Sequence, residues 1–425
     1  MNDIGITCPE IIAPAGEWAA LHAALNAGAD AVYFGVAGFN MRAAARNFDV
    51  KELPAIVRRC HYRGCRAYLT LNTQVYDHEF DVLDSILCAT AGAGVDAVIA
   101  SDLAVIEKAV ALGMEVHLST QMSVSNSRSI LFYHRQFGIR RFVLARECSL
   151  ADMALIRQRL ETADPQVSRQ IEFEVFAHGA MCVSVSGRCY LSQFHYGKSA
   201  NRGECLQPCR REFRIEATDE AEMTYDLGTA FAMSPQDLCT LPFLEALIDE
   251  GVAALKIEGR GRSPEYVGFA TQAYREVATS YVKERGSTGF EDRYEALKQR
   301  HLHRLQQVYN RGFSNGFYMG KPMSDWTTAK GSVATARKEY IGLVVNYYRQ
   351  PGTAEVCIHG CDVRGGDRIY VIGNTTGALE TTVESIQRDH EPVEVARKGM
   401  TVAIKISGKV RRNDKLYLIV PSPAA

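Results

Sequence analysis

Residues 66–101 read RAYLTLNTQVYDHEFDVLDSILCATAGAGVDAVIAS and contain the unit from which the first part of the chain is built. A short apolar run, Arg66–Asn72, precedes a polar turn and a helical stretch, Phe80–Ala93. A second apolar run, Ala97–Ser101, follows it. Runs that are apolar on both faces are typical of parallel strands covered by helices. The stretch therefore predicts a strand, a helix and a second parallel strand.

The same unit recurs through the first 260 residues. Eight apolar runs predict strands: Glu10–Ala13, Ala31–Val36, Arg66–Asn72, Ala97–Ser101, Glu115–Thr120, Arg141–Ala145, Glu172–Ala177 and Ala254–Ile257. Helical stretches lie between them: Ala19–Ala27, Val50–Arg63, Phe80–Ala93, Ala104–Leu112, Ser127–Phe137 and Leu150–Arg159. Eight such units favour an α/β fold, a (β/α)₈ TIM-like barrel. An open doubly wound sheet is the alternative, but no Gly-x-Gly-x-x-Gly turn follows the first strand.

The spacing between runs changes twice. About 75 residues separate the seventh run from the eighth, which predicts a Cys-rich insertion at 178–253 within a barrel domain at 1–262. Two predicted helices, Pro264–Val282 and Asp292–Tyr309, and a linker at Thr327–Lys338 form an extension at 263–338. Residues 339–425 predict a small all-β barrel. Its expected strands are Ile341–Tyr348, Ala354–His359, Arg368–Ile372, Leu379–Ile386, Thr401–Ile406 and Lys415–Val420.

Composition sets limits on location and partners. Apolar residues make up 47% of the 425 residues, which is enough for a large buried core. The N-terminus does not have the pattern of a signal peptide, and no apolar run reaches the roughly 20 residues that span a bilayer, so we expect a cytoplasmic protein without a membrane partner. The net charge is −1, so any nucleic-acid contact must come from a local patch. The run Lys409–Lys415 is a candidate, with an ordinary solvated face as the alternative. The sequence does not indicate the oligomeric state.

Twelve cysteines are many for a reduced compartment, where disulfides are rare. Six residues separate Cys182 from Cys189, 15 separate Cys189 from Cys205, and 33 separate Cys205 from Cys239. These gaps are too wide for the tight pairs of a zinc ribbon and suit an iron–sulfur cluster held by separate loops. A zinc site and unliganded thiols remain alternatives. Cys209 is either a replacement for Cys205 or a redox thiol close to the cluster.

Longer motifs carry a resemblance to a known family. Residues Glu174–Ser192 read EVFAHGAMCVSVSGRCYLS, and NRGEC at 201–205, DLC at 237–239, KIEGR at 256–260 and NRGFSNGF at 310–317 accompany them. Together they resemble the collagenase-like peptidase U32 family over Pro9 to about Pro322. The C-terminal strands resemble the translation-factor β-barrel of some members, notably the tRNA uridine 5-hydroxylation proteins.

The resemblance implies a 4Fe–4S cluster on Cys182, Cys189, Cys205 and Cys239 as metal ligands. It implies oxygen-independent hydroxylation, with tRNA as partner and prephenate or a related small carboxylate metabolite as co-substrate. The expected function is prephenate-dependent 5-hydroxylation of the tRNA wobble uridine. Hydroxylation of ribosomal RNA or of a quinone precursor is an alternative within the family. A U32-type peptidase is another, although the sequence has neither His-Glu-x-x-His nor Gly-x-Ser-x-Gly.

Polar residues at the expected strand ends face the mouth of a barrel, where barrel enzymes place their sites. His178 is expected to transfer a proton, with donation to a cluster sulfur or a buried structural role as alternatives. Glu174 and Glu258 are further candidate catalytic residues. The candidate substrate-binding residues are Arg42, Arg46, Asn72, Gln121, Arg146, Lys256 and Arg260. Because arginine forks bind carboxylates with two hydrogen bonds, we expect Arg42, Arg146 and Lys256 to hold the small acid.

Overall fold

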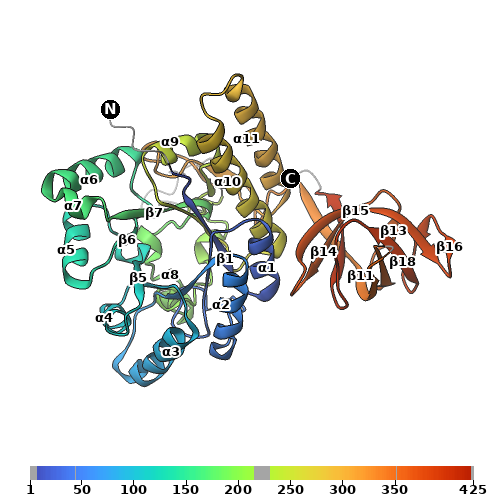
Figure 1. Cartoon of the computed structure of the whole chain (residues 1–425), viewed down its shortest axis with the longest axis horizontal. Helices are drawn as coiled ribbons and strands as arrows, with labels where there is room; N and C mark the ends of the chain where they lie inside the picture. Colours follow the sequence, from blue (N-terminus) through green and yellow to red (C-terminus); the bar gives the residue numbers. More distant parts are fainter. Residues whose placement is uncertain (1–6, 44, 215–229, 351, 423–425) are drawn as a thin grey trace.

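The structure, a computed structural model, describes residues 7–43, 45–214, 230–350 and 352–422 (Figure 1). Residues 215–229 of the expected insertion lie outside the described residues. Eight parallel strands form the first sheet in sequence order, and the last of them, β9, pairs with both β7 and β1. This closure confirms the predicted (β/α)₈ barrel. The strands are β1 (Glu10–Ala15), β2 (Ala31–Phe34), β3 (Arg66–Leu71), β4 (Ala97–Ala100), β5 (Glu115–Leu118), β6 (Arg141–Val143), β7 (Glu172–Ala180) and β9 (Ala254–Ile257).

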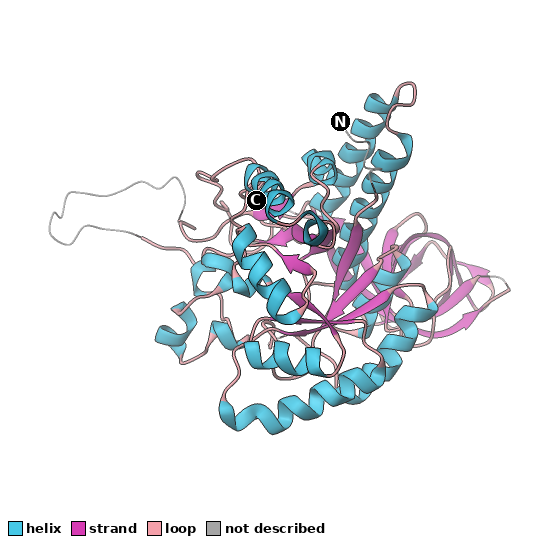
Figure 2. Cartoon of the chain, turned by 60° about the vertical axis from the view of Figure 1, so that its left-hand side comes forward, coloured by secondary structure: helices cyan, strands magenta, loops and turns pink. Residues whose placement is uncertain are grey.

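Helices cover the outside of this barrel (Figures 1 and 2). They are α1 (Trp18–Asn26), α2 (Leu53–Tyr62), α3 (Phe80–Ala93), α4 (Leu103–Ala111), α5 (Ser127–Phe137), α6 (Leu150–Ala163), α7 (Pro165–Ser168), α9 (Leu244–Asp249), α10 (Pro264–Glu284) and α11 (Phe290–Gln307). Four of these helices, α4 to α7, begin at a side chain that caps free backbone N–H groups, as Asp102 does for Ala104 N at 3.0 Å. Among the described residues, none of the helices combines the length and the apolar character that crossing a bilayer requires.

The insertion contains a strand that the periodicity did not predict. Strand β8 (Asp237–Cys239) pairs antiparallel with the far end of β7, and β10 (Phe313–Ser314) pairs with β8. Strand β7 therefore runs to Ala180, three residues beyond its predicted end. A three-residue strand carries no periodic signal of its own, and its pairing with His178–Ala180 of β7 and with β10 defines it.

The interior of the barrel is partly apolar and partly ionic. One cluster of buried side chains fills its centre: Ile12, Ala31, Tyr33, Tyr68, Ala97, Ile99 and Ala254. At the end where the strands begin, Glu10 accepts hydrogen bonds from Tyr68 Oη at 2.6 Å and from Arg141 Nη1 at 2.8 Å. Burying these charges costs free energy unless each has a partner, and here each one does.

Six antiparallel strands close the second barrel, which confirms the predicted all-β domain. They are β11 (Ala336–Tyr348), β12 (Thr353–Ile358), β18 (Thr401–Ile406), β15 (Gly377–Arg388), β14 (Arg368–Gly373) and β19 (Lys415–Pro421). Short strands β13 (Val363–Arg364), β16 (Glu391–Pro392) and β17 (Val395–Ala396) accompany them. Strand β11 includes the last three residues of the predicted linker, because Ala336–Lys338 pair with the last residues of β19.

The second barrel packs against α1 and α10 of the first (Figure 1). Asn26 Nδ2 donates to Thr376 O at 3.1 Å, and Lys338 Nζ lies 2.6 Å from Glu265 Oε1. Gly377 has φ +77° and lies against the backbone of α1, where a Cβ atom would stand 2.7 Å from Ala23 N. Only glycine fits this contact, so the two barrels meet along a close backbone approach.

Candidate functional site

The carboxyl ends of the barrel strands surround a small pocket of about 60 Å³, the mouth pocket. Its lining includes six of the seven predicted substrate-binding residues and one predicted catalytic residue: Arg42, Asn72, Gln121, Arg146, Lys256, Arg260 and Glu258. The structure thus brings these side chains together from the ends of five different strands. Parallel strands in a closed barrel place such ends on one face, as the sequence indicated.

A larger cavity of about 360 Å³ lies over the mouth pocket, and we name it the thiol cavity. Cys182, Cys189, Cys205 and Cys209 all line it. Arg42, Gln121, Arg146 and Glu258 line both spaces, so the two are continuous. Four thiols of the insertion thus line a space that adjoins the polar mouth of the barrel.

Short segments of the insertion hold the cysteines in place. Cys182 follows β7, and Cys189 lies between a 3₁₀ turn (Val185–Gly187) and α8 (Leu191–Tyr196). Backbone N–H groups point at both sulfurs, from Ser184 to Cys182 Sγ at 3.4 Å and from Leu191 to Cys189 Sγ at 3.3 Å. These contacts fix the direction in which each sulfur points.

Residues outside the insertion anchor its loops. Glu147, at a predicted strand end, accepts from Ser186 N at 2.9 Å and so fixes the loop between Cys182 and Cys189. Gly203, just before Cys205, has φ +86°, and a Cβ atom there would lie 2.2 Å from Asn40 O. Only glycine allows this backbone conformation and this close approach to Asn40, so Gly203 helps to hold the loop that carries Cys205.

Cys239 lies elsewhere. It is 1% exposed, does not line the thiol cavity, and its Sγ lies 3.9 Å from Tyr274 Oη. Burial raises the pKa of Cys239 to about 11, so the neutral thiol is favoured. The structure brings Cys182, Cys189 and Cys205 together, with Cys209 as their fourth companion in place of Cys239. The fragment Cys205-x₃-Cys209 was the sequence signal for this arrangement.

His178 is also outside both spaces. It is packed among the rings of Tyr266, Tyr274 and Phe313, with ring centroids 5.6 to 5.7 Å away. Burial lowers the pKa of His178 to about 3, so the imidazole is neutral near pH 7. This placement corresponds to the buried alternative weighed for His178, because the bulge in β7 turns the side chain away from the mouth.

Glu174 and Arg46 are likewise not brought to the cavities around the thiols. Glu174 is 0% exposed inside the barrel, below the mouth pocket, where it accepts from Lys256 Nζ at 2.7 Å. Burial acts to raise the pKa of Glu174, but Lys256 and then His117 outweigh it and lower the pKa. Arg46 is 83% exposed and pairs with Glu17 at 2.5 Å.

Cations predominate around the two spaces. Glu258 Oε1 accepts from Arg42 Nη2 at 2.8 Å and from Arg42 Nε at 3.3 Å. Burial acts to raise the pKa of Glu258, but Arg42, Arg262 and Arg146 lower it to about 2, so this carboxylate stays ionised. Further arginines that the sequence did not single out line the thiol cavity: Arg210, Arg262 and Arg311. Of these, Arg311 Nη1 pairs with Asp237 at 3.2 Å.

Arg146 and Arg260 have no carboxylate partner among the described residues. Arg146 Nη1 donates to Ala180 O at 3.1 Å and its guanidinium stacks on Phe176 at 4.0 Å, while its buried Nε is without a partner in the described part of the chain. Arg260 Nη1 donates to Thr70 Oγ1 at 2.7 Å and Asn40 Oδ1 at 3.0 Å. Burial lowers the pKa of Arg260 to about 10, so it remains a cation. The positive charges of Arg146 and Arg260 are therefore available to bind an anion.

This chain resembles several known proteins in sequence. The model of peptidase family U32 matches residues 16–328. A protein of Porphyromonas gingivalis named collagenase is 40% identical over 96% of this chain and 97% of its own length. A Bacillus subtilis protein named tRNA hydroxylation protein P1 is 32% identical over 96% of this chain and 93% of its own. The Escherichia coli 23S rRNA 5-hydroxycytidine C2501 synthase is 35% identical over 65% of this chain and 40% of its own.

Proposed function

The chain belongs to peptidase family U32, and from this premise we propose that it is an RNA-hydroxylating enzyme. We propose the wobble uridine of tRNA as its substrate, with position 5 of the base as the site of hydroxylation. The single observation that carries the proposal is the thiol cavity, where four cysteines adjoin a pocket rich in arginine at the catalytic end of the barrel.

The cysteines fit a 4Fe–4S cluster better than a single metal ion. Among the described residues, no three His, Cys, Asp or Glu side chains are grouped closely enough to hold one metal ion. A cluster spreads its four thiolates over four irons and does not need that close grouping. We propose Cys182, Cys189, Cys205 and Cys209 as its ligands. A cluster bound there would supply one-electron redox chemistry at the mouth of the barrel.

The surrounding charges also suit this assignment. Four thiolates bring negative charge into a partly buried space, and that charge needs compensation. Arg210 and Arg146 lie near the sulfurs, with Cys209 and Cys182 among the charges that act on them. The thiols and the arginines that would balance their negative charge therefore lie in the same cavity.

The mouth pocket is the proposed site of a small carboxylate such as prephenate. Arg146 and Arg260 have hydrogen bonds only to neutral acceptors, which leaves their charge for a ligand carboxylate. Arg42 already pairs with Glu258, and Lys256 with Glu174. The sequence predicted that Arg42, Arg146 and Lys256 bind the carboxylate. We now propose Arg146 and Arg260 as the carboxylate-binding pair, with Arg42 at the rim of the pocket.

Relative length favours tRNA over other RNAs. The alignment spans 93% of the B. subtilis protein named for tRNA hydroxylation, including the region of the C-terminal barrel. It spans 40% of the E. coli protein named for ribosomal RNA hydroxylation. The whole architecture is therefore shared with the first and only part of it with the second.

Peptidase activity is a second candidate function, favoured by the P. gingivalis relative named collagenase. A serine peptidase needs a nucleophile hydrogen-bonded to a base. Ser186 Oγ instead lies 3.3 Å from Glu147 Oε2, and His178 is enclosed by aromatic rings. These placements give the hydroxylase the better physical support.

Nucleoside analysis tests the proposal. RNA from a strain lacking this protein is digested and examined by mass spectrometry, with and without complementation by the wild-type gene and by Cys209→Ala. We expect 5-hydroxyuridine derivatives to vanish from tRNA, to return with the wild type and to stay absent with the variant. Unchanged hydroxylated nucleosides, together with peptide hydrolysis by the purified protein, would support the peptidase instead.

A further inference from the structure

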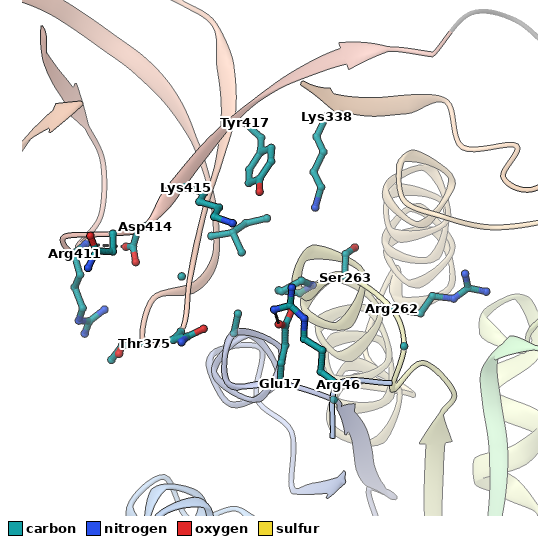
Figure 3. Close-up of a pocket in the computed structure, with 18 of the residues that line it drawn as sticks. Glu17, Arg46, Arg262, Ser263, Lys338, Thr375, Arg411, Asp414, Lys415 and Tyr417 are labelled. Atoms are coloured by element: carbon teal, nitrogen blue, oxygen red, sulfur yellow. Dashed lines mark hydrogen bonds and ion pairs between the residues drawn. The ribbon is translucent and has the colours of Figure 1, made fainter. Parts of the chain in front are cut away.

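A third cavity, of about 820 Å³, lies between the two barrels, and we name it the interdomain cleft (Figure 3). The first barrel contributes Glu17, Arg46 and the segment 260–264. The second contributes the turn 372–375, which joins β14 to β15, and the loop 411–415 before β19. Neither barrel alone forms this space.

Positive side chains dominate the cleft. Lysine and arginine outnumber acidic residues among its lining by seven to two. Both acids are already engaged: Glu17 pairs with Arg46 at 2.5 Å, and Asp414 accepts from Thr376 Oγ1 at 2.6 Å and from Arg411 N at 2.8 Å. Lys338 pairs with Glu265, and Arg262 lies 3.9 Å from Asp237, so the surplus of positive charge rests on the other cations of the cleft.

Three cations of the second barrel hold most of this surplus. Arg411, Arg412 and Lys415 form no ion pair with a carboxylate in the part of the chain that the structure describes. Arg412 and Lys415 are exposed. Lys415 and Lys338 extend toward the first barrel, opposite Arg46 (Figure 3). Like charges gathered across an open space repel one another, and an extended polyanion between them would relieve that repulsion.

The cleft leads to the catalytic end of the first barrel. Ala45, Gly261 and Arg262 line both the cleft and the thiol cavity, and Arg260 lines both the cleft and the mouth pocket. Arg262 lies with its guanidinium 3.7 Å from the ring centre of Tyr309. A chain of phosphates in the cleft would thus run directly beside the space where the base must react.

We propose that the interdomain cleft binds the sugar–phosphate backbone of the RNA next to the nucleotide that enters the thiol cavity. This inference rests on the proposed function and assigns a place to its substrate. The second barrel acts as one half of a clamp, with Arg412 and Lys415 as phosphate contacts. Such contacts set register without reading sequence, while the thiol cavity takes the base.

Binding of an unmodified tRNA transcript tests the inference. Arg412→Ala with Lys415→Ala is compared with a control, Arg397→Ala with Lys398→Ala, which removes the same charge from two exposed residues of the same barrel outside the cleft. Affinity is measured by fluorescence anisotropy over a salt series. We expect the cleft variant to bind about tenfold more weakly at low salt. Its slope of log affinity against log salt should fall by about 1.4 to 1.8, since each phosphate contact contributes roughly 0.7 to 0.9. The control should match the wild type.

A charge-retaining variant sharpens the test. Arg412→Lys with Lys415→Arg should keep most of the affinity, because a phosphate in a backbone contact accepts either cation. Unchanged thermal unfolding and iron content would show that the variants are folded. Wild-type affinity and slope in the alanine pair, or equal losses in both alanine pairs, would overturn the cleft assignment.

Failure of the inference is distinct from failure of the proposed function. If the knockout strain loses hydroxylated uridine while the cleft variant binds the transcript normally, the cleft is wrong and the function stands. If the strain keeps its hydroxylated nucleosides and the wild-type protein does not bind the transcript, both the cleft assignment and the proposed function are wrong.

Discussion

The two ends of the first barrel treat buried charge in opposite ways. Where the strands begin, Arg141 bonds Glu10 at 2.8 Å and Glu172 at 2.7 Å, so its charge is fully matched. Where the strands end, Arg146 is half-buried and has only a carbonyl and an aromatic ring as partners in the described chain. Matched charges hold the barrel together, whereas the unmatched charge is available to a ligand.

The largest effect is expected from the thiols above the unmatched end. Cys209→Ala should abolish cluster assembly, because it removes one of four thiolates in the shared cavity. Cys239→Ala is the matched control and should retain the cluster, since its sulfur lies under Tyr274 outside the cavity. Iron and acid-labile sulfide in anaerobically purified protein measure the result. Loss of the cluster in the Cys239 variant alone would restore the ligand set that the family resemblance implied.

The arginine pair tests the comparison directly. Arg141→Met should destabilise the protein by up to about 3–5 kcal/mol, because Glu10 keeps only its partly exposed partner Arg66 and Glu172 also loses its cation. Arg146→Met should cost less than this, since Arg146 forms no direct ion pair and Glu258 keeps its bond to Arg42. It should instead weaken prephenate binding about thirtyfold or more, equivalent to roughly 2 kcal/mol for losing one side of a buried charge pair. Denaturant unfolding and calorimetric titration give the two quantities. Equal destabilisation by both variants would remove the distinction between the ends.

Low pH should destabilise the end of the barrel where the strands end, because Glu258 becomes protonated there. Its pKa is lowered to about 2 in the folded protein, so its ionised form adds stability that is present above the unfolded value near 4.5. That contribution, on the order of 3 kcal/mol, should disappear as the pH falls from about 4.5 to 2. The stability difference between wild type and Glu258→Gln, measured by urea unfolding, should therefore shrink over this range. A difference that is independent of pH would mean that Glu258 is not held ionised by its arginines.

The smallest effect is expected from Arg46. Its ion pair with Glu17 is exposed, and such pairs contribute about 0–1 kcal/mol. Arg46→Ala should leave both stability and prephenate affinity close to those of the wild type, while Arg146→Met changes the affinity strongly. A large loss of prephenate affinity in the Arg46 variant would place the small acid in the interdomain cleft instead.

The order and type of the elements followed from local sequence. The eight barrel strands begin where the apolar runs begin, and the helix at Ser127–Phe137 has the predicted bounds. Burial between helices requires such runs, so the pattern is visible in the residues themselves. The short strand Asp237–Cys239 was not visible, because its existence depends on pairing with β7 across 57 residues.

The sequence also predicted part of the candidate site. Polar residues at the strand ends predicted all the charged residues of the mouth pocket, since all strand ends of a parallel barrel share one face. Glu174 lies deeper, one layer below Lys256, and a strand's residues do not report how far along the axis they lie. His178 follows a bulge that rotates it out of the alternation on which the prediction relied.

By itself, the sequence determined the two barrels, the insertion and the residue types that gather at the mouth. These follow from periodicity and composition, which act over a few residues. Only the tertiary structure decided that Cys209 rather than Cys239 joins the other three thiols, and that Arg146 lacks a carboxylate partner in the described chain. Both depend on how loops far apart in sequence converge, because a thiol's neighbours and a cation's partners are set by distances in space.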